Sequence, residues 1–131
     1  MLATKDDVFK KIKSCLVDAL GVEEEDIKPD ATLVGDLGAE SIDFLDIVFR
    51  LEKTFDIKIA RGEFFPEEMM TDATYVQDGR VNEAGLAALR KRMPFANFDE
   101  FAKNPAVQDF RSLFTVAALC RFIEDKLKAA N

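Results

Sequence analysis

The most restrictive feature of this sequence is an apolar stripe at helical spacing between residues 44 and 55. Its members recur at the steps of three and four residues that put side chains on one buried helix face, and they are Phe44, Ile47, Val48, Leu51 and Phe55. Three more apolar residues, Ile42, Leu45 and Phe49, lie off this stripe. A helix from about Ser41 to Phe55 therefore carries more apolar surface than one core contact explains, and the surplus lies beside Ser41.

Two other stretches have the same periodicity. Residues 4–20 place Val8, Ile12 and Leu16 on one face, and Gly21 is a natural stop for that helix. A last helix is expected to begin near Thr115, a suitable N-cap, and its apolar face contains Val116, Leu119, Phe122, Ile123 and Leu127. The sequence thus predicts an all-α fold, a helical bundle with three main helices.

Residues 60–114 separate the second and last of these helices. Asn82 as a cap and Pro94 as a terminator bracket a short helix, residues 98–104 and 105–110 read as further helical turns, and residues 56–59 and 74–77 suggest strands. Seven of the twelve phenylalanines fall in this segment, too many for a disordered linker. We expect a mostly helical insertion within a single domain of residues 1–131, whose rings either enlarge the core or surround a ligand or partner.

Composition narrows the functional classes. The chain has 131 residues and no histidine, so Ser-His and Cys-His nucleophiles and imidazole metal sites are excluded. Cys15 and Cys120 each lie within an apolar stripe and have no metal-site spacing, which favours buried free thiols. No apolar run approaches the roughly 20 residues of a membrane span, and the amino terminus lacks an apolar signal core. We therefore expect a cytoplasmic monomer without metal, without stable membrane insertion and without enzymatic activity.

The negative charge is concentrated in one region. The whole chain has a net charge of −7, whereas residues 23–56 hold eleven acids and three bases, a balance of −8. The remainder therefore carries about +1. A local negative field disfavours nucleic acid and suits a partner with a basic docking face, although acids also simply keep a small protein in solution.

Ser41 stands between a glycine-containing acidic loop, GDLGAE, and the central helix. A serine at a helix start is most often an N-cap. Here Gly35 and Gly38 allow a bulky group to approach the backbone, and a helix N-terminus favours a phosphate ester. Because no catalytic base is available nearby, Ser41 is better interpreted as a target that another enzyme modifies than as a nucleophile.

These residues resemble the acyl carrier proteins. The stretch LGAESIDFLDIVFRLEKTFDIKI, with ATLVGDLG before it, is similar to the family's loop, its attachment serine and the helix that follows. Leu37 and Gly38 match the loop, Ser41 matches the serine that bears phosphopantetheine, and Ile42 matches the leucine after it. FTVAALCRFIEDKL is similar to the closing helix of the family. The resemblance covers about 75 residues, in the blocks 1–59 and 112–130.

The resemblance implies a carrier function. A phosphopantetheinyl transferase would attach 4′-phosphopantetheine to Ser41, and its thiol would hold acyl intermediates as thioesters for enzymes of fatty-acid, lipid or secondary-metabolite synthesis. The residues expected to shelter the acyl chain are Phe44, Ile47, Val48 and Leu51. Acyl-transfer or synthase enzymes with basic docking faces would contact a surface made of Asp36, Glu40, Ile42, Asp43, Leu45 and Asp46.

The sequence departs from the family pattern in three places, and three other functions are alternatives to an acyl carrier. Glu40 stands where the family has aspartate, Arg50 interrupts the exposed face of the helix, and segment 60–114 replaces a short third helix. The cargo could be an aminoacyl or peptidyl group instead of a fatty acyl group. The chain could also be an interaction module whose serine is never modified, or a small hydrolase that uses Ser41, which the missing base disfavours.

Overall fold

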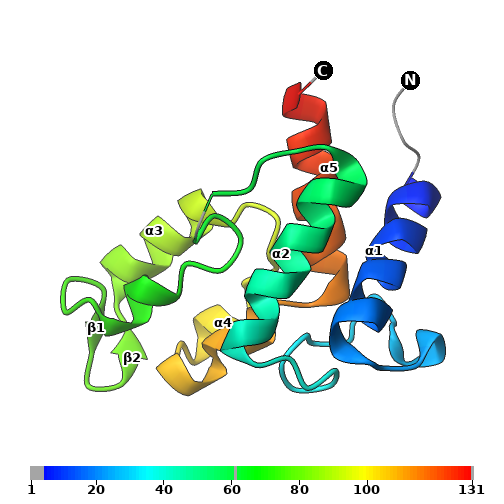
Figure 1. Ribbon diagram of the computed structural model, residues 1–131. Coiled ribbons are helices and arrows are strands. Elements are labelled where there is room, and N and C mark those ends of the chain that lie inside the picture. Colours follow the sequence, from blue (N-terminus) through cyan, green and yellow to red (C-terminus); the bar gives the residue numbers. More distant parts are fainter. Residues whose placement is uncertain (1–4, 61, 131) are drawn as a thin grey trace.

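Three long helices form one side of the molecule in the computed structural model, which describes residues 5–60 and 62–130 and leaves out the side chains at positions 5, 41, 67 and 130. They are α1 (Lys5–Leu20), α2 (Ser41–Phe55) and α5 (Val116–Ala130), and α1 packs against both of the others (Figure 1). All three expected helices are thus present, and the all-α, carrier-like bundle is confirmed.

The bundle core consists of the stripes that the periodicity predicted. Val8, Ile12 and Leu16 of α1 are at most 1% exposed, and Ile47 and Leu51 of α2 are at most 2% exposed. On α5 the buried side chains include Val116, Leu119, Phe122 and Ile123. Cys15 and Cys120 are buried free thiols, as expected.

Ordered loop structure joins α1 to α2. After the short helix η1 (Glu24–Asp26), the chain passes along the start of α5, where Leu33 N–H donates to Phe114 O at 2.9 Å and Val116 N–H donates to Ala31 O at 2.9 Å. Ile27 and Leu33 are buried in the core, which anchors the loop. This pairing fixes the approach of the chain to Ser41.

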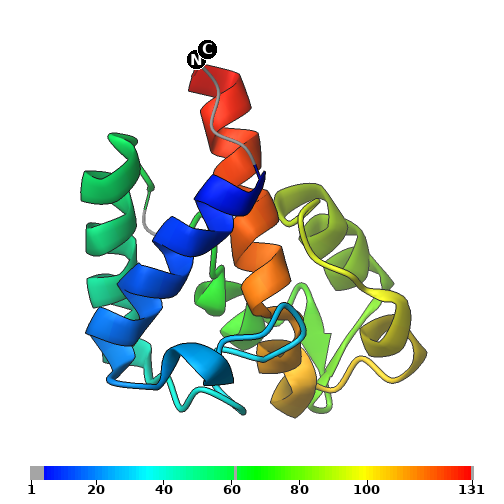
Figure 2. The ribbon, with the colours of Figure 1, turned by 90° about the vertical axis from the view of Figure 1, so that its right-hand side faces the viewer.

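Segment 60–114 lies on the other side of α5 from α1, as the two views show (Figures 1 and 2). Its elements in the described part are η2 (Glu67–Thr71), β1 (Val76–Gln77), β2 (Arg80–Val81), α3 (Glu83–Arg92), α4 (Asp99–Lys103) and η3 (Val107–Leu113). The segment is mostly helical, as expected, with one antiparallel hairpin in which Val76 faces Val81. Asp78 and Gly79 form its turn with φ of 54° and 75°, values that suit a tight hairpin.

Two of the predicted helix caps are present, whereas one of the predicted strands is not. Asn82 accepts a hydrogen bond from Gly85 N–H at 2.8 Å at the start of α3, and Thr115 Oγ1 accepts one from Ala118 N–H at 3.1 Å at the start of α5. Residues 56–59 were predicted as a strand, and this is wrong. There Asp56 ends α2 in a left-handed conformation with φ 53°, and Ile59 N–H donates to the Glu52 carboxylate at 2.9 Å instead of to a neighbouring strand.

Candidate functional site

The start of α2 is capped by its acidic neighbours. Glu40 occupies the N-cap position with extended backbone, and Ser41 is the first residue of the helix. Glu40 N–H donates to the Asp43 carboxylate at 2.7 Å, and Asp43 N–H donates to Glu40 O at 2.9 Å. The N-cap role that the sequence offered to Ser41 therefore belongs to Glu40; the side chain of Ser41 lies outside the described residues.

The loop before Ser41 is shaped by a reciprocal pair of hydrogen bonds. Thr32 N–H donates to the Asp36 carboxylate at 2.9 Å, and Asp36 N–H donates to Thr32 Oγ1 at 3.0 Å. A Cβ at Gly35 would approach Thr32 Oγ1 to 2.8 Å, so this glycine accommodates the threonine. Gly38 has φ +74°, a conformation that only glycine adopts without strain, and it faces open space. Space for a bulky group near the backbone exists at Gly38.

The outward face of α2 carries an exposed apolar ridge. Ile42 is 70% exposed, Leu45 is 66% exposed and Phe49 is 55% exposed. We call these three side chains the α2 ridge. Large apolar side chains with so much accessible surface, all on one helix face, are typical of a surface that contacts a partner or ligand.

Acidic groups surround this ridge, but most of them also have partners within the chain. Asp36 and Glu40 are exposed, whereas Asp43 and Asp46 are half-buried. Asp46 forms an ion pair with Arg50 at 2.9 Å, so the base that interrupts the acidic face is partly neutralised by a neighbour on the same helix. Asp36 and Asp43 accept the loop and capping hydrogen bonds described above. The four acids thus both shape the site and give it negative charge.

An apolar cavity of about 860 Å³ lies between α2 and the residues that follow it. Its α2 side comprises the three ridge residues with Phe44, Val48 and Glu52. We call the opposite side the outer wall, and its lining residues are Ile59, Ala60, Gly62, Phe64, Phe65, Glu68 and Thr71. The volume lies within the range of cavities that bind small molecules. Along α2 the cavity runs from the residue next to Ser41 to Glu52, about 15 Å at the helical rise.

Stacked aromatic rings connect the two sides of the cavity. Phe44 stacks on Phe65 with ring centroids 4.6 Å apart and an interplanar angle of 7°. Phe65 in turn meets Phe114 edge to face at 4.5 Å, and Phe64 contacts Phe114 at 5.2 Å. Five other rings of segment 60–114 are buried in the core: Phe95, Phe98, Phe101, Phe110 and Phe114. Most of the phenylalanines therefore enlarge the core, while Phe64 and Phe65 also line a cavity.

The predicted acyl-shelter residues divide into two groups. Phe44 and Val48 line the cavity, whereas Ile47 and Leu51 are at most 2% exposed and belong to the core. Phe49 and the outer wall were not among the residues predicted for the site. Phe49 had a detectable signal, since it lies off the core stripe. Phe64 and Phe65 had none, because the packing of Phe65 on Phe44 and of Phe64 on Phe95 and Phe122 joins segments in a way that no local periodicity reveals.

The described part of the chain contains neither a metal-binding cluster nor a membrane-spanning helix. Residues 5–60 and 62–130 contain no cluster of acids or cysteines that could hold a metal ion. Within the same residues, no helix is long and apolar enough to cross a membrane.

The sequence also matches a known family. Residues 10–68 match the family model described as the phosphopantetheine attachment site, in which 4′-phosphopantetheine is attached covalently to a serine. The match covers α1 from residue 10 onward, all of α2 and the outer wall as far as Glu68, so it ends inside segment 60–114. Together with the helical bundle, this match shows that residues 10–68 are similar to the phosphopantetheine attachment site of carrier proteins.

Proposed function

We propose that the chain is an acyl carrier protein and that Ser41 bears the phosphopantetheine. The observation that carries this proposal is the position of Ser41 at the start of α2, one residue before the apolar cavity begins at Ile42. The other serine within the matched residues, Ser14, is an exposed residue in the middle of α1 and does not line that cavity. A group attached at position 41 would have direct access to apolar shelter.

Ser41 acts as a target in the loading step. Its hydroxyl oxygen attacks the phosphorus of coenzyme A that bears the pantetheine, and the bond from that phosphorus to adenosine 3′,5′-bisphosphate breaks. The serine proton passes to a base of the transferase, since this chain has no histidine to accept it. The products are the serine phosphodiester and adenosine 3′,5′-bisphosphate. The helix N-terminus favours the negative phosphodiester, and the open space at Gly38 accommodates it.

The cavity supports an acyl cargo over an aminoacyl one. When bound, the prosthetic group supplies a flexible arm whose thiol holds the cargo as a thioester. Phe44, Val48 and Phe65 offer hydrocarbon contacts, and burial of each cargo methylene contributes about 0.8 kcal/mol. An aminoacyl cargo carries a free ammonium group, which would lose its hydration among these apolar side chains without gaining interactions that compensate for the loss. Ile47 and Leu51 support the cavity from the core side and do not line it.

The α2 ridge and its acids form the proposed docking face. Ile42 and Leu45 provide exposed apolar contacts, and Asp36, Glu40 and Asp46 add negative charge around them. A transferase, acyltransferase or synthase with an apolar patch rimmed by lysine and arginine would be complementary to this surface. A cytoplasmic location, a monomeric state and a role in lipid or secondary-metabolite synthesis without enzymatic activity of its own belong to the same proposal.

The thioester itself provides the test of cargo class. Octanoyl and glycyl groups are loaded as the corresponding phosphopantetheine thioesters, and their cleavage by hydroxylamine is followed in folded and in urea-unfolded protein. We expect folding to protect the octanoyl thioester roughly tenfold, the equivalent of about two buried methylenes, and to leave the glycyl thioester unprotected. Val48→Gln should reduce the protection, whereas Thr54→Gln, on the same helix but outside the cavity, should not. Equal rates for both cargoes would argue for an aminoacyl carrier or for no sheltering role.

A further inference from the structure

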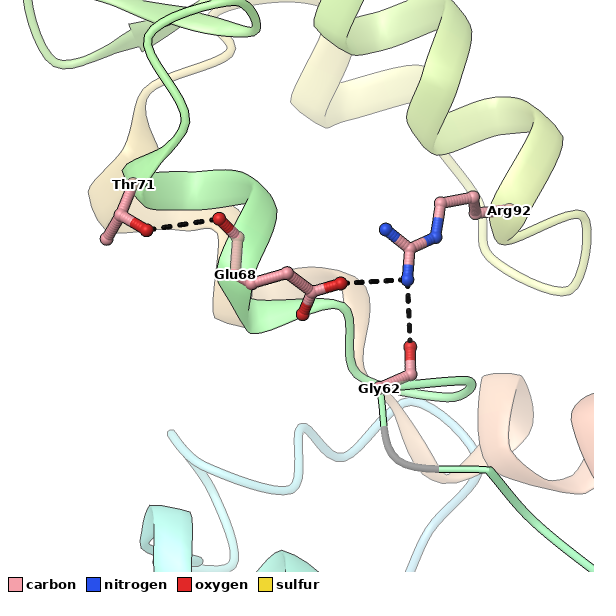
Figure 3. A network of polar contacts seen from close by, with 4 residues as sticks. All are labelled: Gly62, Glu68, Thr71 and Arg92. Atoms are coloured by element: carbon pink, nitrogen blue, oxygen red, sulfur yellow. Dashed lines mark hydrogen bonds and ion pairs between the residues drawn. The ribbon is translucent and has the colours of Figure 1, made fainter.

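The outer wall of the cavity is fastened from behind by α3. Arg92 Nη2, at the end of α3, donates to Glu68 Oε1 at 2.9 Å and to Gly62 O at 3.3 Å (Figure 3). Both Gly62 and Glu68 line the cavity, whereas Arg92 does not. Thr71, another lining residue, donates its hydroxyl to Glu68 O at 3.1 Å. Through Gly62 and Glu68, the Arg92 guanidinium therefore holds the outer wall at two points.

Two other contacts tie the same wall to the rest of the fold. Lys126 Nζ of α5 lies 2.7 Å from the Glu63 carboxylate, in an ion pair whose side chains are about a quarter to a third exposed. The ring of Phe64 packs on Phe95 at 5.3 Å and on Phe122 at 5.1 Å. The wall therefore contacts α2 across the cavity through Phe65. On its other side it packs against α5 and against later residues of segment 60–114.

We propose that segment 60–114 sets the width of the cavity and thereby selects the cargo by size, with Arg92 as the positioning residue. This inference rests on the proposed acyl-carrier function. The distance between α2 and the outer wall depends on where Arg92 holds Gly62 and Glu68. A wall held at one distance shelters acyl chains that fill the space and excludes longer or bulkier ones.

We call the hydrogen bonds from Arg92 to Gly62 and Glu68 the clamp. The solvent exposure of its side chains predicts how strongly its loss changes cargo protection. The side chains of Arg92 and Glu68 are 41% and 62% exposed, so the pair is screened by water and salt. Its removal should leave the global fold intact and shift the position of a short segment. The expected change is therefore a redistribution of protection among cargoes, on the order of threefold for each cargo.

The test compares Arg92→Met with Lys91→Met. Lys91 is the exposed neighbouring residue on α3, and the hydrogen bonds to Gly62 and Glu68 come from Arg92. Each variant, modified at Ser41, is loaded with hexanoyl, decanoyl and tetradecanoyl groups, and protection from hydroxylamine is measured. We expect the parent protein and Lys91→Met to share one length profile. Arg92→Met should protect the shorter cargoes about threefold less and extend protection to the longest.

Further measurements separate positioning from a general structural role. The exchanged pair, Arg92→Glu with Glu68→Arg, remakes the ion pair but not the hydrogen bond to Gly62 O, so it should restore the parent profile only in part. High salt should move the parent protein toward the profile of Arg92→Met. Glu68→Gln keeps the shape of the side chain and should give the same change at smaller size, which covers the case that Arg92→Met does not fold. If Ser41 is loaded and shelters cargo but the length profile is unchanged in Arg92→Met and Glu68→Gln, the inference is wrong. If the parent protein shelters no acyl group, the proposed function itself fails.

Discussion

Cys120 is a residue whose chemistry follows directly from its burial. Desolvation inside α5, with the negative charge of Glu124 nearby, raises the pKa of the Cys120 thiol to about 12. The thiol therefore stays protonated in the folded protein at pH values where a cysteine in the unfolded chain ionises, since the unfolded pKa is about 8.5. This contribution to the free energy of unfolding is complete below about pH 8.5 and declines as the pH rises toward 12.

We therefore expect the stability difference between the parent protein and Cys120→Ala to shrink from about pH 7.5 to about pH 10. Urea denaturation at the two pH values measures it. A difference that does not change with pH would contradict the assignment.

In the native protein iodoacetamide should label neither cysteine, because Cys15 and Cys120 are both buried, and only the thiol of the attached arm should react.

Ser41 shows what the sequence predicts at single-residue resolution and what it does not. The position of the serine at the first turn of α2 could be predicted, because the apolar stripe begins directly after it. The choice of Glu40 as N-cap could not, since it depends on Glu40 N–H meeting the Asp43 carboxylate in three dimensions. With Glu40 in that role, capping no longer accounts for a serine at position 41.

At the scale of elements, α2 serves both the fold and the site. Its inner stripe faces the core and its outer ridge borders the cavity. Asp43 at its start accepts the Glu40 N–H and also carries negative charge near the proposed docking face. Asp43→Ala should lower the free energy of unfolding by about 0.5–2 kcal/mol, because a cap acceptor is lost. Asp43→Asn keeps an acceptor oxygen, so it should destabilise less.

Both substitutions remove the charge, so both should slow modification by a phosphopantetheinyl transferase several-fold in kcat/KM. Urea denaturation and transferase kinetics on the two variants separate these roles. Should Asp43→Asn be loaded as fast as the parent protein, Asp43 would have a capping role only.

The elements differ in how well local patterns predicted them. Helices with a full apolar stripe and a side-chain cap, such as α3 behind Asn82 and α5 behind Thr115, were predicted to within a few residues. Residues 56–59 have strand-like alternation, yet Ile59 N–H donates to the Glu52 carboxylate, Ile57 N–H donates to Glu52 O, and no strand of the described chain pairs with them. A local pattern cannot reveal which partner a backbone N–H finds.

At the scale of the whole molecule, one aromatic cluster joins the carrier bundle to segment 60–114. Phe114 is fully buried, contacts Phe64, Phe65 and Phe110, and its carbonyl accepts the Leu33 N–H of the loop before α2. We expect one cooperative unfolding transition for the entire chain and a loss of about 3–5 kcal/mol in Phe114→Ala. Phe49→Ala, at an exposed ridge position, should change stability by about 0.5 kcal/mol or less.

Circular dichroism and intrinsic fluorescence of the single tyrosine, Tyr75, report on the bundle and on segment 60–114 respectively. Two separate transitions would mean that the two parts unfold independently.

The cavity is also a property of the whole molecule. Neither side of it is complete until Phe44 meets Phe65, a pairing between segments that sequence periodicity does not encode. The sequence therefore could not separate Phe44 and Val48, which line the cavity, from Ile47 and Leu51, which lie in the bundle interior.

The most direct test of the carrier function at Ser41 is the intact mass of the folded protein after incubation with coenzyme A and a broad-specificity phosphopantetheinyl transferase. The parent protein and Ser14→Ala should each gain one phosphopantetheine, and Ser41→Ala should gain none. A parent protein that stays unmodified beside an active transferase, or a Ser41→Ala variant that is still modified, would contradict the assignment of Ser41.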